Sequence, residues 1–190
     1  MADPFRVLAL PGSLRRGGFN RRLLDTAAAI APTALRIDVH DELASVPLFD
    51  EDLEQSTQGG PAGVRHLRER VAAADGLLIA TPEYNQALPG VLKNALDWLS
   101  REAPHAVLAG KPVAIAGVSS GRWGTRLAQA DLRRVLTATA ALVMPAPMLF
   151  VSDAAQWFDA DGLHDQRQRD ALSTLLQAFT HWIARARIDA

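Results

Sequence analysis

The chain has 190 residues, 48% of them hydrophobic, and its 20 basic and 21 acidic side chains leave a formal net charge of −1. This length and hydrophobic content favour one water-soluble domain with a sizeable core, spanning residues 1–190. The balanced charge argues against a protein that recruits nucleic acid or anionic lipid through a global field. The lack of cysteine excludes disulfides, thiolate metal sites and cysteine nucleophiles.

The chain also lacks the patterns of membrane and secreted proteins. No apolar run reaches the roughly 18 residues that a membrane-spanning helix needs. The first residues, Met-Ala-Asp-Pro-Phe-Arg, have neither the basic region nor the apolar stretch of a signal peptide. We therefore expect a cytoplasmic protein with no membrane partner.

Strand and helix patterns alternate along the chain. In order, they predict a strand at residues 6–10, a helix at 21–31, a strand at 35–39, a helix at 61–74 and a strand at 76–80. There follow a helix that begins at Pro89, a strand at 113–118, a helix at 127–139, a strand within 141–151 that Pro145 and Pro147 interrupt, and a helix over 172–186. The apolar run at 76–80 is typical of a strand buried on both faces of a parallel sheet.

This alternation predicts an α/β fold, a doubly wound five-stranded parallel sheet with helices on both faces. A single short crossover joins the first two strands, so we expect the strand order 2-1-3-4-5. Ligands bind such sheets at the carboxyl ends of the strands, where the order reverses, which here is between the first and third strands. The loops after those strands should therefore form the functional site.

The loop after the first strand, residues 11–20, has the chemistry of a phosphate cradle. Gly12 permits a tight turn, the following helix directs backbone N–H groups outward, and Ser13, Arg15 and Asn20 add donors. It is neither a Walker A loop, because Lys-Ser/Thr is missing after its second spaced glycine, nor a Gly-x-Gly-x-x-Gly fingerprint. Spacing alone leaves open the alternative of a glycine-rich loop with solvated arginines.

Two further loops follow the third and fourth strands. Pro82 keeps the third strand from continuing as a central strand, and a polar loop runs from it to the helix that begins at Pro89. After the fourth strand, the small residues of segment 117–125 let backbone N–H groups approach a flat ligand. For this last loop, an ordinary strand-to-helix turn with serine caps is the alternative.

Taken together, the segments of these loops resemble the NAD(P)H-dependent FMN reductase family. They read Gly-Ser-Leu-Arg-x-x-x-x-Asn, Thr-Pro-Glu-Tyr-Asn-x-x-x-Pro-Gly-x-Leu-Lys-Asn-Ala-x-Asp-Trp-x-Ser-Arg, and Gly-Lys-Pro-Val-Ala followed by Gly-x-Ser-x-Gly-x-x-Gly. The resemblance covers nearly the whole chain. It implies a flavodoxin-like fold, FMN as cofactor and NADPH or NADH as co-substrate, in a family that includes quinone, azo-dye and chromate reductases.

The same resemblance implies which residues bind FMN. Ser13, Arg15 and Asn20 would hold the phosphate; Pro82, Glu83, Tyr84 and Asn85 would line the ribityl chain and the isoalloxazine ring, partly through backbone groups; and Ser119 and Gly121 would close the other side of the ring. The chain departs from the family at three places, with Gly18 for a usual serine, Gln86-Ala87 for an aromatic residue and serine, and Leu127 for a usual arginine.

We expect the flavin to accept hydride from a nicotinamide at N5 and to reduce a quinone, azo compound, chromate or free flavin on the same face, in a ping-pong cycle. No catalytic side chain is then required. The resemblance implies a homodimer or homotetramer. A flavodoxin-like electron carrier or flavin-binding module without nicotinamide oxidation is the alternative. A phospho-receiver module is excluded, because Leu10-Pro11 and Ala80-Thr81 stand where its acidic residues belong.

We expect several other conspicuous residues to have no role in the reaction. The histidines share no metal-ligand spacing and are expected to be solvated or to cap helices; they are His40, His66, His105, His164 and His181. The acidic segment 50–54 is interpreted as a solvated loop, and segment 159–162 as a turn. Trp98 is either a subunit contact or a flank of the core, and Arg122-Trp123 either stacks on substrate or stays solvated.

Overall fold

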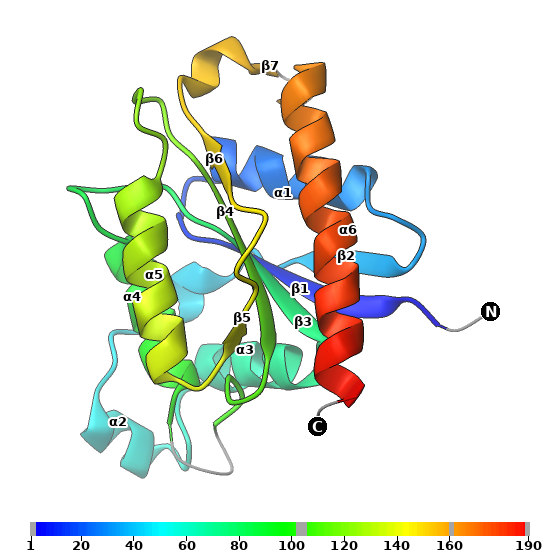
Figure 1. Ribbon diagram of the computed structural model, residues 1–190. Coiled ribbons are helices and arrows are strands. Elements are labelled where there is room, and N and C mark those ends of the chain that lie inside the picture. Colours follow the sequence, from blue (N-terminus) through cyan, green and yellow to red (C-terminus); the bar gives the residue numbers. More distant parts are fainter. Residues whose placement is uncertain (1–2, 102–105, 160–161, 189–190) are drawn as a thin grey trace.

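The computed structural model of the chain describes residues 3–101, 106–159 and 162–188. Its elements are, in order, β1 (Phe5–Pro11), α1 (Phe19–Ala29), β2 (Leu35–Val39), η1 (Leu43–Ser45), α2 (Glu51–Ser56), α3 (Ala62–Ala73), β3 (Gly76–Ala80) and α4 (Gly90–Leu99). They continue with β4 (Pro112–Val118), α5 (Arg126–Ala138), β5 (Leu142–Val143), β6 (Leu149–Val151), η2 (Ala154–Gln156), β7 (Phe158–Asp159), β8 (Gly162–Leu163) and α6 (Gln166–Ile188) (Figure 1).

The main sheet has the strand order β2-β1-β3-β4-β5, and every pair in it is parallel. This confirms the predicted fold class and strand order. The order in which the chain adds strands to the sheet reverses between β1 and β3, as expected. The expected fifth strand is divided into β5 and β6, which both pair with β4. Pro145 and Pro147 lie between the two parts, because proline has no N–H to donate to a sheet ladder.

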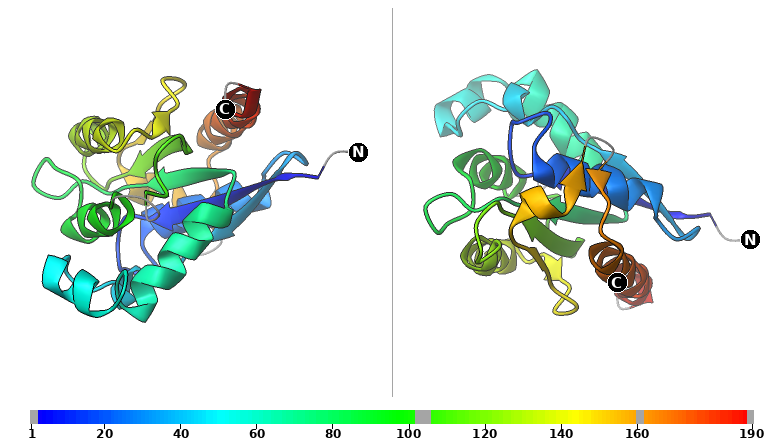
Figure 2. Two further views of the ribbon diagram at one scale, coloured as in Figure 1. Left: turned by 90° about the horizontal axis from the view of Figure 1, so that it is seen from below. Right: turned by 90° about the horizontal axis from the view of Figure 1, so that it is seen from above.

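Side chains that alternate along the strands face two separate hydrophobic cores. On β1, Val7 and Ala9 pack in the core covered by α1 and α6, whereas Leu8 and Leu10 pack in the core covered by α3, α4 and α5. Figure 2 shows the resulting three layers, with α6 and α3 on opposite sides of the sheet. Both faces are buried, so the central strands β3 and β4 are apolar without alternation, as their sequences predicted.

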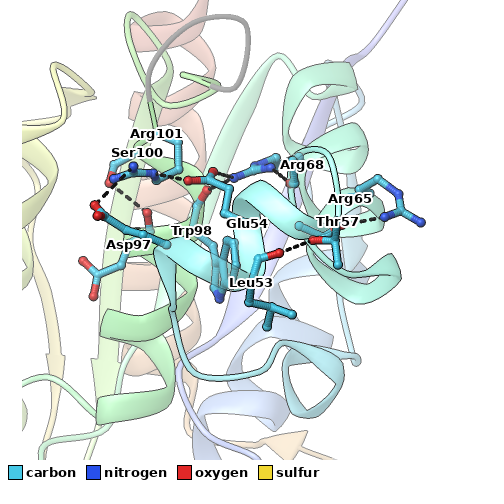
Figure 3. A network of polar contacts seen from close by, with 12 residues as sticks. Leu53, Glu54, Thr57, Arg65, Arg68, Asp97, Trp98, Ser100 and Arg101 are labelled. Atoms are coloured by element: carbon cyan, nitrogen blue, oxygen red, sulfur yellow. Dashed lines mark hydrogen bonds and ion pairs between the residues drawn. The ribbon is translucent and has the colours of Figure 1, made fainter.

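The acidic segment 50–54 is not the solvated loop that its composition predicted. Asp50 caps the short helix α2 by accepting hydrogen bonds from the N–H groups of Asp52 and Leu53. Glu54 points inward, with its side chain 14% exposed, and pairs with Arg68 at 3.0 Å and with Arg101 at 2.8 Å (Figure 3). The sequence interpretation was wrong for Glu54 because two arginines, 14 and 47 residues away, hold its carboxylate.

Trp98 is fully buried, which excludes the reading of this residue as a subunit contact. Its indole N–H donates to the carbonyl of Pro47 at 2.8 Å, and its ring meets that of Phe49 edge to face, with 4.9 Å between centroids. The carbonyl of Trp98 accepts two hydrogen bonds from Arg68, at 3.1 and 2.8 Å. This tryptophan therefore ties α4 to the segment before α2 and to α3.

Two further observations concern the turn before α6 and the lengths of the helices. The expected turn at 159–162 falls between β7 and β8, an antiparallel pair, and residues 160 and 161 of that turn lie outside the described residues. Among the helices that the structure describes, none combines the length and the apolarity that crossing a bilayer demands.

We predict that Glu54→Ala lowers the free energy of unfolding by about 3 kcal/mol, because the nearly buried Arg68 guanidinium then lacks its carboxylate. The matched control is Glu51→Ala, three residues earlier on α2, whose carboxylate is 66% exposed and 3.5 Å from Arg101. An exposed pair of this kind should contribute less than about 1 kcal/mol. Urea unfolding of both variants tests the difference, and equal losses would show that burial of Glu54 has no energetic consequence.

Candidate functional site

Three loops meet at the carboxyl edge of the sheet because the strands before them lie in register. Pro11 at the end of β1 pairs with Ala80 at the end of β3, and Ala80 pairs with Ala116 near the end of β4. The loops that follow enclose a cavity of about 120 Å³. Seven of the nine candidate residues line it, namely Ser13, Arg15, Asn20, Pro82, Glu83, Tyr84 and Ser119. Asn85 and Gly121 lie farther along the same two loops.

The loop after β1 ends in a helix whose N-terminus is left open. Gly18 is the N-cap residue of α1, it provides no side-chain cap, and the first turn contains no acidic residue. Within the described chain, the N–H groups of Phe19, Asn20 and Arg21 have no hydrogen-bond acceptor. Free N–H groups and the positive end of the helix dipole make this terminus suitable for an anion.

Ser13 and Arg15 complete this positive surface. The hydroxyl of Ser13 accepts a 3.3 Å hydrogen bond from the N–H of Arg15 and lies 3.2 Å from the hydroxyl of Tyr84. The guanidinium of Arg15 is exposed and has no ion pair among the described residues. Both side chains are therefore available to a ligand in the cavity, as the sequence predicted for a phosphate group.

Asn20 is held differently from Ser13 and Arg15. Its side-chain amide donates to the carbonyl of Val118 and accepts from the N–H of the same residue, both at 2.9 Å, and only 4% of Asn20 is exposed. This two-way bond joins the start of α1 to the end of β4, across 98 residues of sequence. The structure thus gives Asn20 a bracing role, and contact of its side chain with a phosphate stays a prediction.

The loop after β3 contains a tight reversal at its tip. Tyr84 and Ala87 exchange two backbone hydrogen bonds of 3.1 Å, and the two residues between them, Asn85 and Gln86, have φ values of 50° and 64°. Positive φ at both central positions is what a type I′ turn requires, and asparagine tolerates it better than glutamine. The turn presents Tyr84, 48% exposed, at the mouth of the cavity.

Glu83 lines the cavity but is bonded away from it. Its Oε2 accepts hydrogen bonds from the backbone N–H groups of Leu127 at 2.9 Å and Ala128 at 3.0 Å. Both belong to the first turn of α5, so the carboxylate of one loop caps the helix that follows the other. The expectation from the family resemblance that Glu83 lines the isoalloxazine ring stays a prediction.

Near its carboxyl end, β4 has a position, Gly117, where only glycine fits. A Cβ on Gly117 would clash with the side chain of Thr125 and lie 2.6 Å from the carbonyl oxygen of Thr81. Farther along, the hydroxyl of Ser119 accepts a 3.0 Å hydrogen bond from the N–H of Gly121, which fixes the loop that would close over a ring. Gly117 therefore allows the end of β4 to approach Thr81 in the loop after β3 and Thr125 at the start of α5.

The Arg122-Trp123 pair lies on the outer part of this same loop. Trp123 is 66% exposed, and the guanidinium carbon of Arg122 is 4.6 Å from the centroid of its ring. The arginine thus covers one face of the indole in the protein itself. Stacking of this pair on a substrate stays a prediction.

The cavity is also lined by Gly18, which the sequence marked as replacing a usual serine. Sequence reasoning did not include four other lining residues in the site, namely Phe19, Arg21, Val118 and Ser120. The helix was expected to begin at Arg21, whereas α1 begins at Phe19. A start two residues earlier moves Phe19 and Asn20 from the loop into the first helical turn. The apolar spacing of the helix could not reveal this, because its first turn has no acidic residue and no capping side chain.

His40 is neither solvated nor a cap, contrary to the expectation from sequence. It follows β2, is 1% exposed, and neither ring nitrogen has a hydrogen-bond partner among the described residues. Burial lowers the pKa of His40 to about 4, and the positive charge of Arg70 acts in the same direction. The imidazole is therefore neutral at pH 7, and it packs 6.1 Å from the ring of His66, measured between centroids.

The family that this chain matches and the similar proteins found by comparison are all named as NAD(P)H-dependent or quinone-reducing oxidoreductases. Residues 5–156 match the model of a family described as NADPH-dependent FMN reductase. The chain is 42% identical over 188 residues to an NAD(P)H-dependent FMN reductase of Pseudomonas aeruginosa, covering 98% of this chain and 100% of the relative. It is 40% identical over 190 residues to a quinone reductase of Escherichia coli, covering 99% and 100%. Among solved structures it resembles FerB, a flavoenzyme NAD(P)H:(acceptor) oxidoreductase from Paracoccus denitrificans, with a TM-score of 0.87, 31% identity, and coverage of 96% and 98%.

We predict that His40 makes stability fall as the pH is lowered from 6.5 to about 4. In that window the unfolded chain binds a proton on this imidazole and the folded protein does not, so the folded state loses about 1.4 kcal/mol per pH unit. Wild type should therefore lose about 3 kcal/mol relative to His40→Phe between pH 7.5 and pH 4. Urea unfolding across this range is the measurement, with the exposed His181→Gln as control. Parallel pH profiles for wild type and His40→Phe would refute a buried neutral histidine.

Proposed function

This chain belongs to the NADPH-dependent FMN reductase family and is an oxidoreductase that uses FMN with NAD(P)H as electron donor, and we propose that it reduces quinones and related acceptors in a ping-pong cycle. The observation that carries the proposal is the open N-terminus of α1, beside the hydroxyl of Ser13 and the exposed guanidinium of Arg15, at the point where the strand order reverses. Names of relatives support quinones as acceptors, since one is called a quinone reductase and another a 2-hydroxy-1,4-benzoquinone reductase. Azo compounds, chromate and free flavin are further candidates.

The residues present fit FMN. Its phosphate would be held by the N–H groups of Phe19–Arg21, the Ser13 hydroxyl and the Arg15 guanidinium. The negative charge of the phosphate complements this positive surface. A cavity of about 120 Å³ is small beside the roughly 300–1,000 Å³ of sites that enclose a whole ligand. The isoalloxazine ring would therefore lie across the loops after β3 and β4, with one face open.

When bound, FMN supplies the redox chemistry by accepting hydride at N5 and giving electrons to an acceptor. The protein would bind the flavin, orient its ring toward the substrates and shield the ring from water. Backbone N–H groups near Asn85, and beside Gly121 whose own N–H is bonded to Ser119, would stabilise negative charge on the edge of the isoalloxazine ring. Tyr84 at the mouth of the cavity and Trp123 on the loop after β4 are both exposed and would offer flat apolar surface to a quinone. No side-chain acid or base is needed for hydride transfer itself.

We further propose that the protein works in the cytoplasm as a homodimer or homotetramer, with residues 1–190 acting as one domain. Large apolar side chains at the carboxyl edge of the sheet, such as Trp123 and Leu127, are more than half exposed. Together with the open face of the isoalloxazine ring, they support a subunit contact at this edge. Burial of Trp98 removes that residue from the candidate contacts.

Steady-state kinetics test the proposed cycle. One ring site, with no second nucleotide fingerprint in the sequence, requires nicotinamide and acceptor to use the same face in turn. Plots of reciprocal initial rate against reciprocal NADPH concentration, at several fixed quinone concentrations, should therefore be parallel. Lines that intersect would indicate a ternary complex and contradict the proposal. A protein that binds FMN but oxidises neither NADPH nor NADH would instead be an electron carrier.

Arg15→Ala tests the phosphate site. A charged hydrogen bond contributes roughly 1.5–3 kcal/mol, so the substitution should weaken FMN binding about 10- to 150-fold. Riboflavin lacks the phosphate, and its affinity should scarcely change. Arg16→Ala is the matched control, because Arg16 is the adjacent exposed arginine and should affect both flavins little. Titration of the apo-forms of wild type and both variants measures all six affinities. Equal losses for FMN and riboflavin in Arg15→Ala, or no loss, would exclude the phosphate role.

A further inference from the structure

The carboxylate of Glu83 connects the two loops that would hold the flavin ring. It lies three residues after β3, and its partners Leu127 and Ala128 lie 44 and 45 residues away, in the first turn of α5. We propose that Glu83 is a positioning residue that sets the spacing of these loops and is not a ligand of the flavin. The inference rests on the proposed function, because it assigns a task within the same ring site.

The first support is that α5 depends on Glu83 for its cap. Thr125, the N-cap residue, makes no side-chain cap, and the first turn of α5 contains no acidic residue. The Thr125 hydroxyl instead accepts a 3.0 Å hydrogen bond from the side chain of Gln129, inside the protein. Glu83 is thus the anionic side chain that satisfies this N-terminus in the described chain, and a carboxylate there is stabilised by the helix dipole.

The second support is the pattern of cross-links around the cavity. The start of α1 is joined to the end of β4 by Asn20 and Val118, and the loop after β1 approaches the loop after β3 through the hydroxyls of Ser13 and Tyr84. The bond from Glu83 to α5 supplies the remaining link, between the loops after β3 and β4. Each wall of the cavity is therefore held to its neighbour before a ligand enters.

The third support is electrostatic. A carboxylate that faced the ring would repel the negative charge that a flavin gains on reduction. Bonded to two helix N–H groups at 2.9 and 3.0 Å, the charge of Glu83 is offset by the protein itself. This arrangement leaves backbone N–H groups, not a side-chain anion, to face the reduced ring.

The proposal predicts effects on the ring that are independent of the phosphate. Glu83→Ala should weaken FMN and riboflavin binding by equal factors, about tenfold, because two charge-assisted hydrogen bonds that order the ring loops are lost. Glu83→Gln keeps an oxygen that can accept the same N–H groups, and its affinities should stay within about threefold of wild type. The matched control is Asp165→Ala, which removes a carboxylate bonded at 2.9 Å to the N–H of Gln168 at the start of α6.

Asp165→Ala should lower the thermal midpoint, as loss of a helix cap does, without changing riboflavin affinity. If it weakens riboflavin as much as Glu83→Ala does, general destabilisation explains both, and the positioning role is refuted. Unchanged affinities in Glu83→Ala would refute it as well, as would a loss in Glu83→Gln equal to that in Glu83→Ala.

Amide hydrogen exchange at Leu127 and Ala128 distinguishes positioning from direct contact. In apo-protein, exchange at both amides should be faster in Glu83→Ala than in wild type. Riboflavin added to wild type should leave their protection in place. Loss of protection on binding would mean that Glu83 turns to the flavin, which overturns the proposal. Failure of wild type to bind either flavin would instead refute the proposed function, while the exchange data on apo-protein would still report on the Glu83 bond.

Discussion

The order in which the parallel strands pair is the constraint on which the site depends. Because β3 lies between β1 and β4, the ends of these three strands follow one another along the sheet, about 4.8 Å apart from strand to strand. Loops that begin at Pro11, Ala80 and Val118 are thereby brought to one edge, although more than half of the chain separates the first from the last. The contacts that join one loop to another, such as those of Ser13 with Tyr84 and of Asn20 with Val118, require this adjacency.

Polar side chains at this edge divide into two groups. Asn20 is bonded to the backbone at the end of β4 and Glu83 to the backbone at the start of α5, so both side chains hold neighbouring elements of the site together. Ser13, Arg15 and the first N–H groups of α1 remain available to a ligand. A site whose walls are fixed in advance loses less conformational entropy on binding, which favours a cofactor that must be held in one orientation.

Strands and their order were predictable from sequence because they follow from local patterns. Apolar runs such as that of β3 mark strands buried on both faces, and one short crossover leaves few topologies open. The place of the site followed from the same topology. Seven of the nine residues that the family resemblance implied line one cavity, and their contact with FMN stays a prediction.

Partners of polar side chains were not predictable, because they come from distant parts of the chain. Nothing near Glu54 indicates that Arg68 and Arg101 will bury its carboxylate, and nothing near His40 indicates that its ring will be enclosed without a hydrogen bond. The same holds for Glu83, whose sequence neighbours suggest a ligand whereas its partners are the N–H groups of a helix 44 residues away. Residue type predicts what a side chain can bond to, and only the fold decides what it meets.

A crystal structure of the protein with FMN tests the central claim most directly. The account predicts phosphate oxygens within about 2.7–3.2 Å of the N–H groups of Phe19–Arg21 and of the Ser13 hydroxyl. It also predicts the isoalloxazine ring between the loops after β3 and β4, with Glu83 still bonded to Leu127 and Ala128. A phosphate bound elsewhere on the sheet edge, with the start of α1 facing only water, would contradict it.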